Sequence, residues 1–259
     1  MKKAVLISAV MLSFFNTAMA HDRCGMPQGR PCAQFYSRLD AFRLLQANEN
    51  GTADAEGNLN VVENASRQLG VSLEYATDNF IYLQQQSGGA SATSEVRAVF
   101  QSVVSAAKIR GPLHEATSAF VELVRYENGI ADASGNFSLV ANMVQTRNVS
   151  YKSATEIFNS LIRSEGGASS TSDARAVFQQ INRIYEFHPG ASAAAYRKLR
   201  ASENDSSGAL GNFQLVHRAG VLCGDIVRAA NDFNEVLAQT GGSSSTSEAR
   251  QLFSRLYGI

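Results

Sequence analysis

The chain has 259 residues, 44% of them hydrophobic, and its 23 lysines and arginines balance its 23 aspartates and glutamates. This composition is typical of a folded globular protein and argues against a disordered one. The balanced charge and the lack of a polybasic run argue against nucleic-acid binding and against electrostatic attachment to anionic lipid.

The first twenty residues predict a signal peptide. Lys2 and Lys3 give a positive start, residues 4–15 form an apolar core, and residues 18–20 read Ala-Met-Ala, an A-x-A cleavage site. The apolar core is shorter than the roughly 20 residues that a membrane span needs, and no later segment meets that length. The compact form of the signal suits a bacterial protein. We therefore expect a periplasmic or secreted protein that is not inserted into a membrane after cleavage.

Residues 21–35 form a turn-rich N-terminal segment with two of the three cysteines. Cys24 and Cys32 bracket a loop rich in Gly and Pro, and an oxidising compartment favours a disulfide between them. Two free thiols or a two-thiol metal site are the alternatives, although no second pair of ligands accompanies these thiols. Cys223 lies among apolar residues and is expected to be a small buried side chain.

The remainder of the chain states nearly the same pattern three times. A Glu-Asn pair, a Gly-Asn pair and a Thr-Ser-acid-x-Arg segment recur in order, with an offset of 78 residues from the first copy to the second and of 75 to 76 from the second to the third. A fixed period of this kind predicts a tandem-repeat protein. The predicted repeats are residues 36–110, 111–188 and 189–259.

Each repeat is expected to form four short helices, because apolar residues recur at helical spacing and no alternating β-branched run predicts a strand. Ala76, Phe80 and Leu83 illustrate the apolar face of the third helix. A recurring asparagine is expected to cap the start of the second helix, since Asn is a favoured N-cap residue. This asparagine is Asn58, Asn136 or Asn212 in the three copies. The fourth helix is expected to bury the pairs Phe100/Val103, Phe178/Ile181 and Phe253/Leu256.

The chain is therefore predicted to be all-α, with three tandem four-helix repeats of period 75–78 stacked as an α-solenoid or as a compact helical-repeat array. The repeats must stack because a single repeat cannot bury its apolar face alone. An open solenoid and a closed three-fold rosette both satisfy this requirement. The open form is favoured because the copies are not identical and their ends need not meet.

Two charged positions recur in all three copies, one near the end of the first helix and one on the fourth. A catalytic role would need a nucleophile or a histidine that recurs with them, and none does. We therefore predict that each glutamate forms an ion pair with the arginine of its own repeat and so locks the first helix onto the fourth. The predicted pairs are Glu49 with Arg97, Glu127 with Arg175, and Glu203 with Arg250.

Two recurring loops have residues that could hold an ion. Residues 49–58 are rich in oxygen ligands but do not follow the EF-hand register, and Gly208 replaces Asp54 in the third copy. The Gly-Gly loop that begins at Gly88 could hold an anion at a helix start, but it lacks the Walker lysine and an acid follows it. Turn and cap roles are favoured for both loops, and no metal or cofactor is expected.

His21 would become the N-terminal residue after signal cleavage, and its amine and imidazole together could bind copper. Copper enzymes that resemble this start need a second histidine facing the first, and they sit on β-sandwich scaffolds. The helical pattern predicts neither, so copper binding stays an alternative.

No Ser/His/Asp, Cys/His or metal-binding constellation stands out in the sequence. The favoured function is a non-enzymatic exported repeat protein that binds a protein or peptide partner in the bacterial cell envelope or secretome. The alternative is a hydrolase acting in the envelope with an acidic active site. Its candidate acids are Glu115, Asp225 and Glu235, which are otherwise surface charges.

Four tyrosines outside the recurring core pattern are the candidate partner-binding residues. They are Tyr75, Tyr82, Tyr126 and Tyr185. The chain has no tryptophan, which counts against a glycan-stacking platform and favours a protein or peptide partner. The alternative is that these tyrosines are half-buried at seams between repeats, with their hydroxyls in solvent.

Overall fold

The computed structural model describes residues 37–127 and 129–259, and in these residues it is all-α, as the sequence predicts. Twelve α-helices and three short 3₁₀ helices form the described chain, with no strand among them. The predicted signal peptide, the Cys24–Cys32 disulfide and the copper alternative at His21 all lie outside the described residues.

The helices fall along the chain into three groups of four, each with a 3₁₀ helix before its last member. The first group is α2 (Arg38–Ala47), α3 (Thr52–Leu69), α4 (Leu73–Gln86), η1 (Gly89–Ala92) and α5 (Thr93–Ile109). The second is α6 (Leu113–Val124), α7 (Ile130–Arg147), α8 (Tyr151–Glu165), η2 (Ala168–Ser170) and α9 (Thr171–Arg183). The third is α10 (Pro189–Arg200), α11 (Ser206–Cys223), α12 (Ile226–Gln239), η3 (Gly242–Ser245) and α13 (Thr246–Tyr257).

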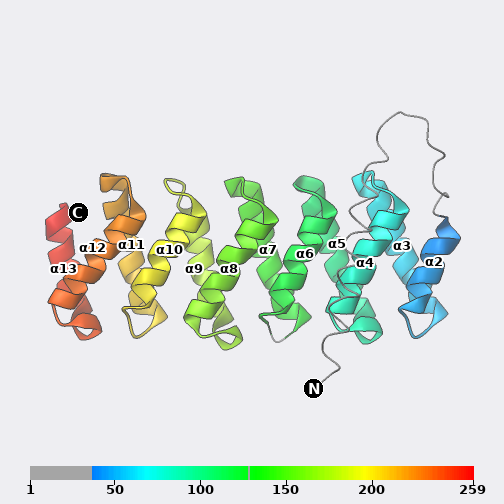
Figure 1. The fold of residues 1–259 in the computed structure, drawn as a ribbon, viewed down its shortest axis with the longest axis horizontal. Helices are drawn as coiled ribbons and strands as arrows, with labels where there is room; N and C mark the ends of the chain where they lie inside the picture. The colour runs from blue at the N-terminus through cyan, green and yellow to red at the C-terminus, as the bar shows by residue number, and fades with distance from the viewer. Residues whose placement is uncertain (1–36, 128) are drawn as a thin grey trace, which may run out of the picture. The chain divides into compact units, whose positions relative to one another are not determined.

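Helix packing follows chain order. Each helix packs on the next helix, and, apart from the α9–α11 pair, on the one after it. The even-numbered helices α2 to α12 therefore form one layer and the odd-numbered helices α3 to α13 the other (Figure 1). None of these helices combines the length and hydropathy that a membrane-spanning segment needs.

Several helix boundaries follow directly from local side-chain chemistry. Ser37 forms a capping box with Asp40 at the start of α2, so that each residue's side chain accepts from the other's backbone N–H. Ser72 caps α4 and Ser150 caps α8, each through a hydroxyl that accepts a backbone N–H of the first turn. Gly70 ends α3 in the left-handed region, with φ of 66°, where a glycine has no steric penalty.

The recurring asparagine does not cap the second helix of each group, so that prediction is wrong. α3 begins at Thr52, and Asn58 lies inside it, fully buried. The other two copies agree, in α7 and α11, at Asn136 and Asn212. Asparagine is usually kept out of helix interiors because its side chain competes for backbone groups. Here a half-buried carboxylate gives the amide a different partner.

The cores of the groups are built around edge-to-face phenylalanine pairs between the third and fourth helices. Ring centroids lie 5.2 Å apart for Phe80 and Phe100, and the other two groups repeat this contact. The repeats are Phe158 with Phe178 at 5.1 Å and Phe233 with Phe253 at 5.2 Å. All six rings are buried, as the apolar spacing predicts.

Two side chains predicted to be buried are exposed. Leu256 is 66% exposed, whereas its counterparts Val103 and Ile181 are fully buried. The difference arises because α6 packs on α5 and α10 packs on α9, while no described helix follows α13. Cys223 is also exposed, at the end of α11 where the helix stops at Gly224.

Candidate functional site

The recurring glutamate of the first group is held by side chains from three other elements. The Glu49 carboxylate accepts from the hydroxyl of Thr93, at 2.7 Å, and from the side-chain amides of Asn58 and Gln84. Thr93 is the first residue of α5, Asn58 lies in α3 and Gln84 in α4. One carboxylate after α2 therefore ties together all four helices of its group.

The recurring arginine of this group binds the same asparagine and does not bind the glutamate. Arg97 Nε donates to Asn58 Oδ1 at 2.6 Å, and Nη2 donates to the carbonyl of Asp54 at 2.7 Å. Nη2 also forms an ion pair with the Asp54 carboxylate at 3.1 Å. The predicted Glu49–Arg97 ion pair is thus wrong. The Asn58 amide stands between them, giving its N–H to the carboxylate and its carbonyl to the guanidinium.

The Glu, Asn, Thr and Arg contacts recur in the other two groups, where the counterpart of Gln84 is apolar (Ile162 or Leu237) and the carboxylate has no third-helix donor among the described residues. The second uses Glu127, Asn136, Thr171, Arg175 and Asp132. The third uses Glu203, Asn212, Thr246 and Arg250, with Gly208 in the place of the aspartate. Arg250 still donates to the Gly208 carbonyl at 2.9 Å, so loss of the carboxylate leaves the backbone contact intact.

A helical glycine before each asparagine makes room for the arginine. A Cβ added to Gly57 would lie 2.6 Å from Arg97 Cζ, and one added to Gly211 would lie 2.6 Å from Arg250 Nη2. At Gly135 the same distance is 3.0 Å, to Arg175 Nη2. The sequence contained a signal for this role. Glycine recurs at this helical position in all three copies although it costs about 1 kcal/mol relative to alanine, which indicates that a larger side chain is excluded there.

These three clusters (named below the Glu–Asn–Arg clusters) are suited to holding helices together. Their carboxylates already accept several hydrogen bonds, and no histidine or cysteine takes part. In the parts of the chain that the structure describes, no three His, Cys, Asp or Glu side chains are grouped so that they could hold a metal ion.

A further buried carboxylate occurs once and joins two helix groups. Glu165, the last residue of α8, has a side chain that is 0% exposed. It accepts from the Tyr196 hydroxyl at 2.5 Å, from Arg200 Nε at 2.9 Å and from the Ser206 hydroxyl at 2.5 Å. Burial and the bond to Glu165 raise the pKa of Tyr196, which keeps this hydroxyl a donor. The sequence pattern missed Glu165 because its counterpart in the first copy is Ser87.

The four candidate tyrosines are not gathered into one site. Tyr75 of α4 lies 2.8 Å from His114 Nδ1 of α6, and its oxygen accepts from the His114 backbone N–H. Tyr82 of α4 is half-buried, and burial raises its pKa. Arg163 of α8 donates to the hydroxyl of half-buried Tyr126, at 2.8 Å, and lies over its ring.

Tyr185 is the most exposed of the four. Its side chain follows α9 and is 67% exposed. The Arg147 guanidinium lies 4.7 Å from the centre of its ring, a cation–π contact on the open surface. Tyr75, Tyr82 and Tyr126 are therefore half-buried on or next to the even-numbered helices α4 and α6. Among the four candidates, only Tyr185 offers a largely exposed ring.

The candidate acids of the hydrolase alternative are also apart from one another. Glu115 lies on α6. Asp225 is the N-cap of α12 and accepts the backbone N–H groups of Val227 and Arg228, at 2.9 and 3.0 Å. Glu235 lies ten residues further on, about 15 Å along the same helix. These three acids do not form a pair of facing carboxylates.

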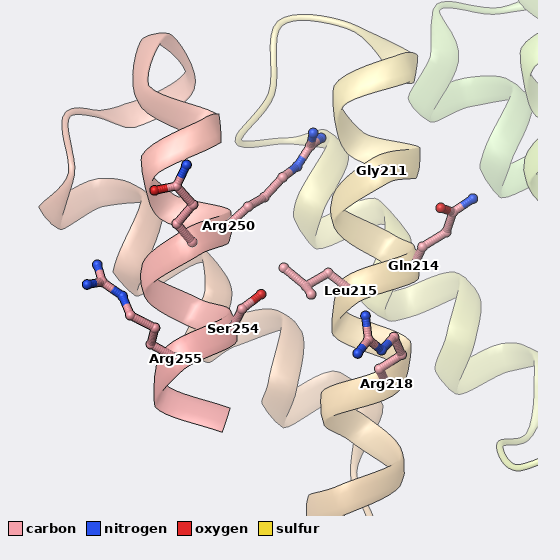
Figure 2. Close-up of a pocket in the computed structure, with 8 residues that line it drawn as sticks. Gly211, Gln214, Leu215, Arg218, Arg250, Ser254 and Arg255 are labelled. Carbon is pink, nitrogen blue, oxygen red and sulfur yellow. The ribbon is translucent and has the colours of Figure 1, made fainter. Parts of the chain in front are cut away.

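An open groove of about 780 Å³ runs between α11 and α13. Figure 2 shows Leu215 and Ser254 facing each other across it, with Arg250 reaching from α13 toward Gly211. Its lining residues include three arginines and no acid. They are Gly211, Gln214, Leu215, Arg218, Arg250, Gln251, Ser254 and Arg255.

No family model, no curated protein sequence and no solved structure matches this chain. The geometry and chemistry of the described residues are therefore the basis for assigning a function.

Replacing Asn58 with alanine should lower the free energy of unfolding by roughly 2–3 kcal/mol, because the carboxylate and the guanidinium it joins would each lose a partner. Urea unfolding followed by circular dichroism measures this. Asn60→Ala is the matched control, since Asn60 lies two residues away on the same helix and is exposed. Equal effects of the two substitutions would contradict the bridging role of Asn58.

Gly57→Ala should fail to stabilise the protein, although alanine is favoured over glycine in a helix by about 1 kcal/mol. The added methyl group would displace Arg97 from Asn58 and Asp54. In an Arg97→Ala background that clash is absent, and the usual gain of about 1 kcal/mol should return. A double-mutant cycle from urea unfolding measures the difference, and the same gain in both backgrounds would contradict the steric role of Gly57.

Proposed function

We propose that this chain is an exported α-solenoid of three tandem four-helix repeats that binds a protein or peptide partner and does not catalyse a reaction on it. The observation that carries the proposal is the threefold recurrence of the Glu–Asn–Arg cluster, each confined to one group of four helices. Residues that recur in this way serve to hold each unit together. Recognition is then left to surface residues that differ between the units.

The packing of the terminal helices supports an open stack over a closed rosette. α2 packs on α3 and α4, and α13 packs on α11 and α12. Contacts in chain order are what a solenoid requires, because each of its units contacts only its neighbours. The proposed units are residues 36–110, 111–188 and 189–259.

Export rests on the N-terminal sequence, with its two lysines, apolar core and Ala-Met-Ala site. A periplasmic or secreted location also suits a disulfide between Cys24 and Cys32, since thiols are oxidised there. In this proposal the partner is a protein or peptide of the cell envelope or of the secreted fraction.

The four tyrosines remain part of the proposed partner surface, and Tyr185 is the strongest candidate among them for a direct contact. Tyr185 has a ring that a partner could cover, because the residue is 67% exposed. The Arg147 guanidinium, 4.7 Å from the ring centre, leaves most of the ring accessible. Tyr75, Tyr82 and Tyr126 are half-buried, which favours a role at the seams between helices.

Removing one unit tests the solenoid. Deletion of residues 112–187 keeps Gly111 and the His188 cap, so that three residues still connect α5 to the following helix, now α10. A solenoid should accept this deletion and unfold cooperatively with an all-α circular dichroism spectrum, because α10 meets α5 as it met α9. Failure of the shortened protein to fold, both as it is and with the added Ser87→Glu substitution, would contradict the solenoid.

The deletion also removes Glu165, so Tyr196 and Arg200 lose their acceptor. Adding Ser87→Glu to the shortened protein places a carboxylate at the end of α4, at the position that corresponds to Glu165 at the end of α8. It should raise the free energy of unfolding by roughly 1.5–3 kcal/mol, the value of hydrogen bonds to a charged group. Ser87→Gln is the uncharged control and should recover less. In the full-length protein Ser87→Glu should destabilise, because Ser87 is buried there with a hydroxyl that has no partner among the described residues.

The double substitution Tyr82→Ser and Tyr126→Ser should lower the free energy of unfolding by roughly 2–4 kcal/mol, since both half-buried rings would be lost. Tyr185→Ser should change it by less than about 1 kcal/mol, because that ring is exposed. Thermal unfolding and capture of a partner from the envelope fraction would be measured in parallel. Unchanged stability with lost capture in the double variant would instead place the partner on Tyr82 and Tyr126.

A further inference from the structure

We propose that the groove between α11 and α13 binds a peptide segment of the partner that carries several carboxylates. This inference rests on the proposed partner-binding function and names the chemistry of one contact. The groove is the open hollow of about 780 Å³ described above. Its lining has three guanidinium groups and no carboxylate, so it attracts a negatively charged ligand.

Two of the three arginines are free to bind a ligand. Arg250 is held in the groove wall, where Nε donates to Asn212 Oδ1 at 2.6 Å and Nη2 to the Gly208 carbonyl at 2.9 Å. Arg218 and Arg255 donate no hydrogen bond and form no ion pair within the described residues. Both are exposed, one on each helix of the groove. A fixed guanidinium with two free ones is suited to bidentate contacts with carboxylates.

The positive charge is specific to the third helix group. Position 218 corresponds to Asn64 and Asn142, and position 255 corresponds to Ser102 and Gln180. At the groove positions the first and second groups therefore carry one arginine each, Arg97 and Arg175, which belong to the Glu–Asn–Arg clusters. The third group carries the same structural arginine and two additional ones.

The counterparts of Arg218 are used within the fold, whereas Arg218 is not. Asn142 accepts a hydrogen bond from Asn182 at 2.8 Å, which joins α7 to α9. Asn64 accepts one from Arg67 at 2.6 Å. Replacing this asparagine by an unpaired arginine removes an internal contact and leaves a cation in the groove. Stability alone does not account for that exchange, whereas an anionic ligand does.

Four exposed arginines elsewhere in the described chain are neutralised by a neighbouring acid. These pairs are Arg38 with Glu63, Arg43 with Asp40, Arg125 with Glu122, and Arg228 with Asp232. The groove lacks such an acid, so its field is not cancelled locally. Figure 2 shows Arg218 on α11 and Arg255 extending from the side of α13 that faces away from α11, so a ligand that contacts both needs more than one carboxylate.

The remaining lining residues favour a peptide over a glycan or a small inorganic anion. Leu215 provides an apolar patch between the charged ends, and Ser254 lies opposite it (Figure 2). Gln251 can donate and accept a hydrogen bond, as a peptide backbone requires. No aromatic ring lines the groove, so it lacks the flat face on which a sugar ring would stack.

Fluorescence anisotropy with the labelled peptide Glu-Ser-Glu-Leu-Glu-Ser-Glu tests the proposal on the full-length mature protein. The peptide should bind more weakly as ionic strength rises, because exposed charges are screened. Its counterpart with Gln at every Glu position should bind at least about 10-fold more weakly, the change expected when charge-assisted contacts are lost. Equal binding of the two peptides would overturn the proposal.

The double variant Arg218→Gln with Arg255→Gln should lose at least about 10-fold in affinity for the acidic peptide. The matched control is Lys108→Gln with Arg183→Gln, which changes the net charge equally at exposed positions on α5 and α9 and should bind as the unsubstituted protein does. Arg218→Lys with Arg255→Lys keeps the charge without the planar fork and should bind with intermediate affinity. Circular dichroism checks that each variant is folded. An equal loss in the matched control would mean that net charge alone drives binding, and would overturn the proposal.

Two further measurements, displacement of the labelled peptide by competitors and capture of the partner, distinguish failure of the groove assignment from failure of the proposed function. Inorganic phosphate or a sulfated oligosaccharide that displaces the peptide as readily as the unlabelled peptide itself would overturn the assignment to a peptide. If the Arg218→Gln, Arg255→Gln variant fails to bind the peptide but still captures the partner of the unsubstituted protein, the groove is not the contact and the proposed function stands. If the unsubstituted protein captures no partner and the 112–187 deletion does not fold, the proposed function itself fails.

Discussion

A neutral asparagine between two opposite charges is the interaction on which each group of four helices depends. Its amide donates to a glutamate and accepts from an arginine, so both charges are satisfied without touching one another. A direct buried ion pair would have to remove both ions from water, which costs several kcal/mol for each. The amide instead lets the arginine stay near the surface, about one-quarter exposed, while the carboxylate is held by hydroxyl and amide donors. The asparagine can therefore sit inside a helix, where it would otherwise be unfavourable.

The neighbouring recurring residues follow from this bridge. A glycine precedes the asparagine because the arginine crosses the helix there, and a threonine begins the fourth helix because its hydroxyl reaches the glutamate. The third group shows which part is dispensable. Gly208 lacks the carboxylate of Asp54 and Asp132, yet its backbone carbonyl still accepts from the arginine. The bridge tolerates loss of an exposed ion pair because such pairs contribute little.

Residues that do not recur are where the units differ in chemistry. Glu165 joins the second and third groups through Tyr196, Arg200 and Ser206, and no equivalent carboxylate joins the first and second. Arg218 and Arg255 belong to the same class, since they are present in one copy and unused by the fold. In a protein whose repeated residues maintain structure, such single-copy residues are the natural place for a specific partner contact. This division separates the residues that set stability from those proposed to set recognition.

Sequence alone determined the helical class, the threefold period and most of the core, because apolar spacing and turn residues are local properties. Phe80 and Phe100 were placed correctly for this reason. The partner of each recurring charge was decided by tertiary structure: Glu49 and Arg97 are 48 residues apart, and only the packing of α3 against α5 puts Asn58 between them. Burial at the end of the array was likewise decided by neighbours, since Leu256 repeats the pattern of Val103 but has no following helix against it. The groove could not be predicted from sequence, because Arg218 and Arg255 lie on different helices and line one groove only when α11 packs beside α13.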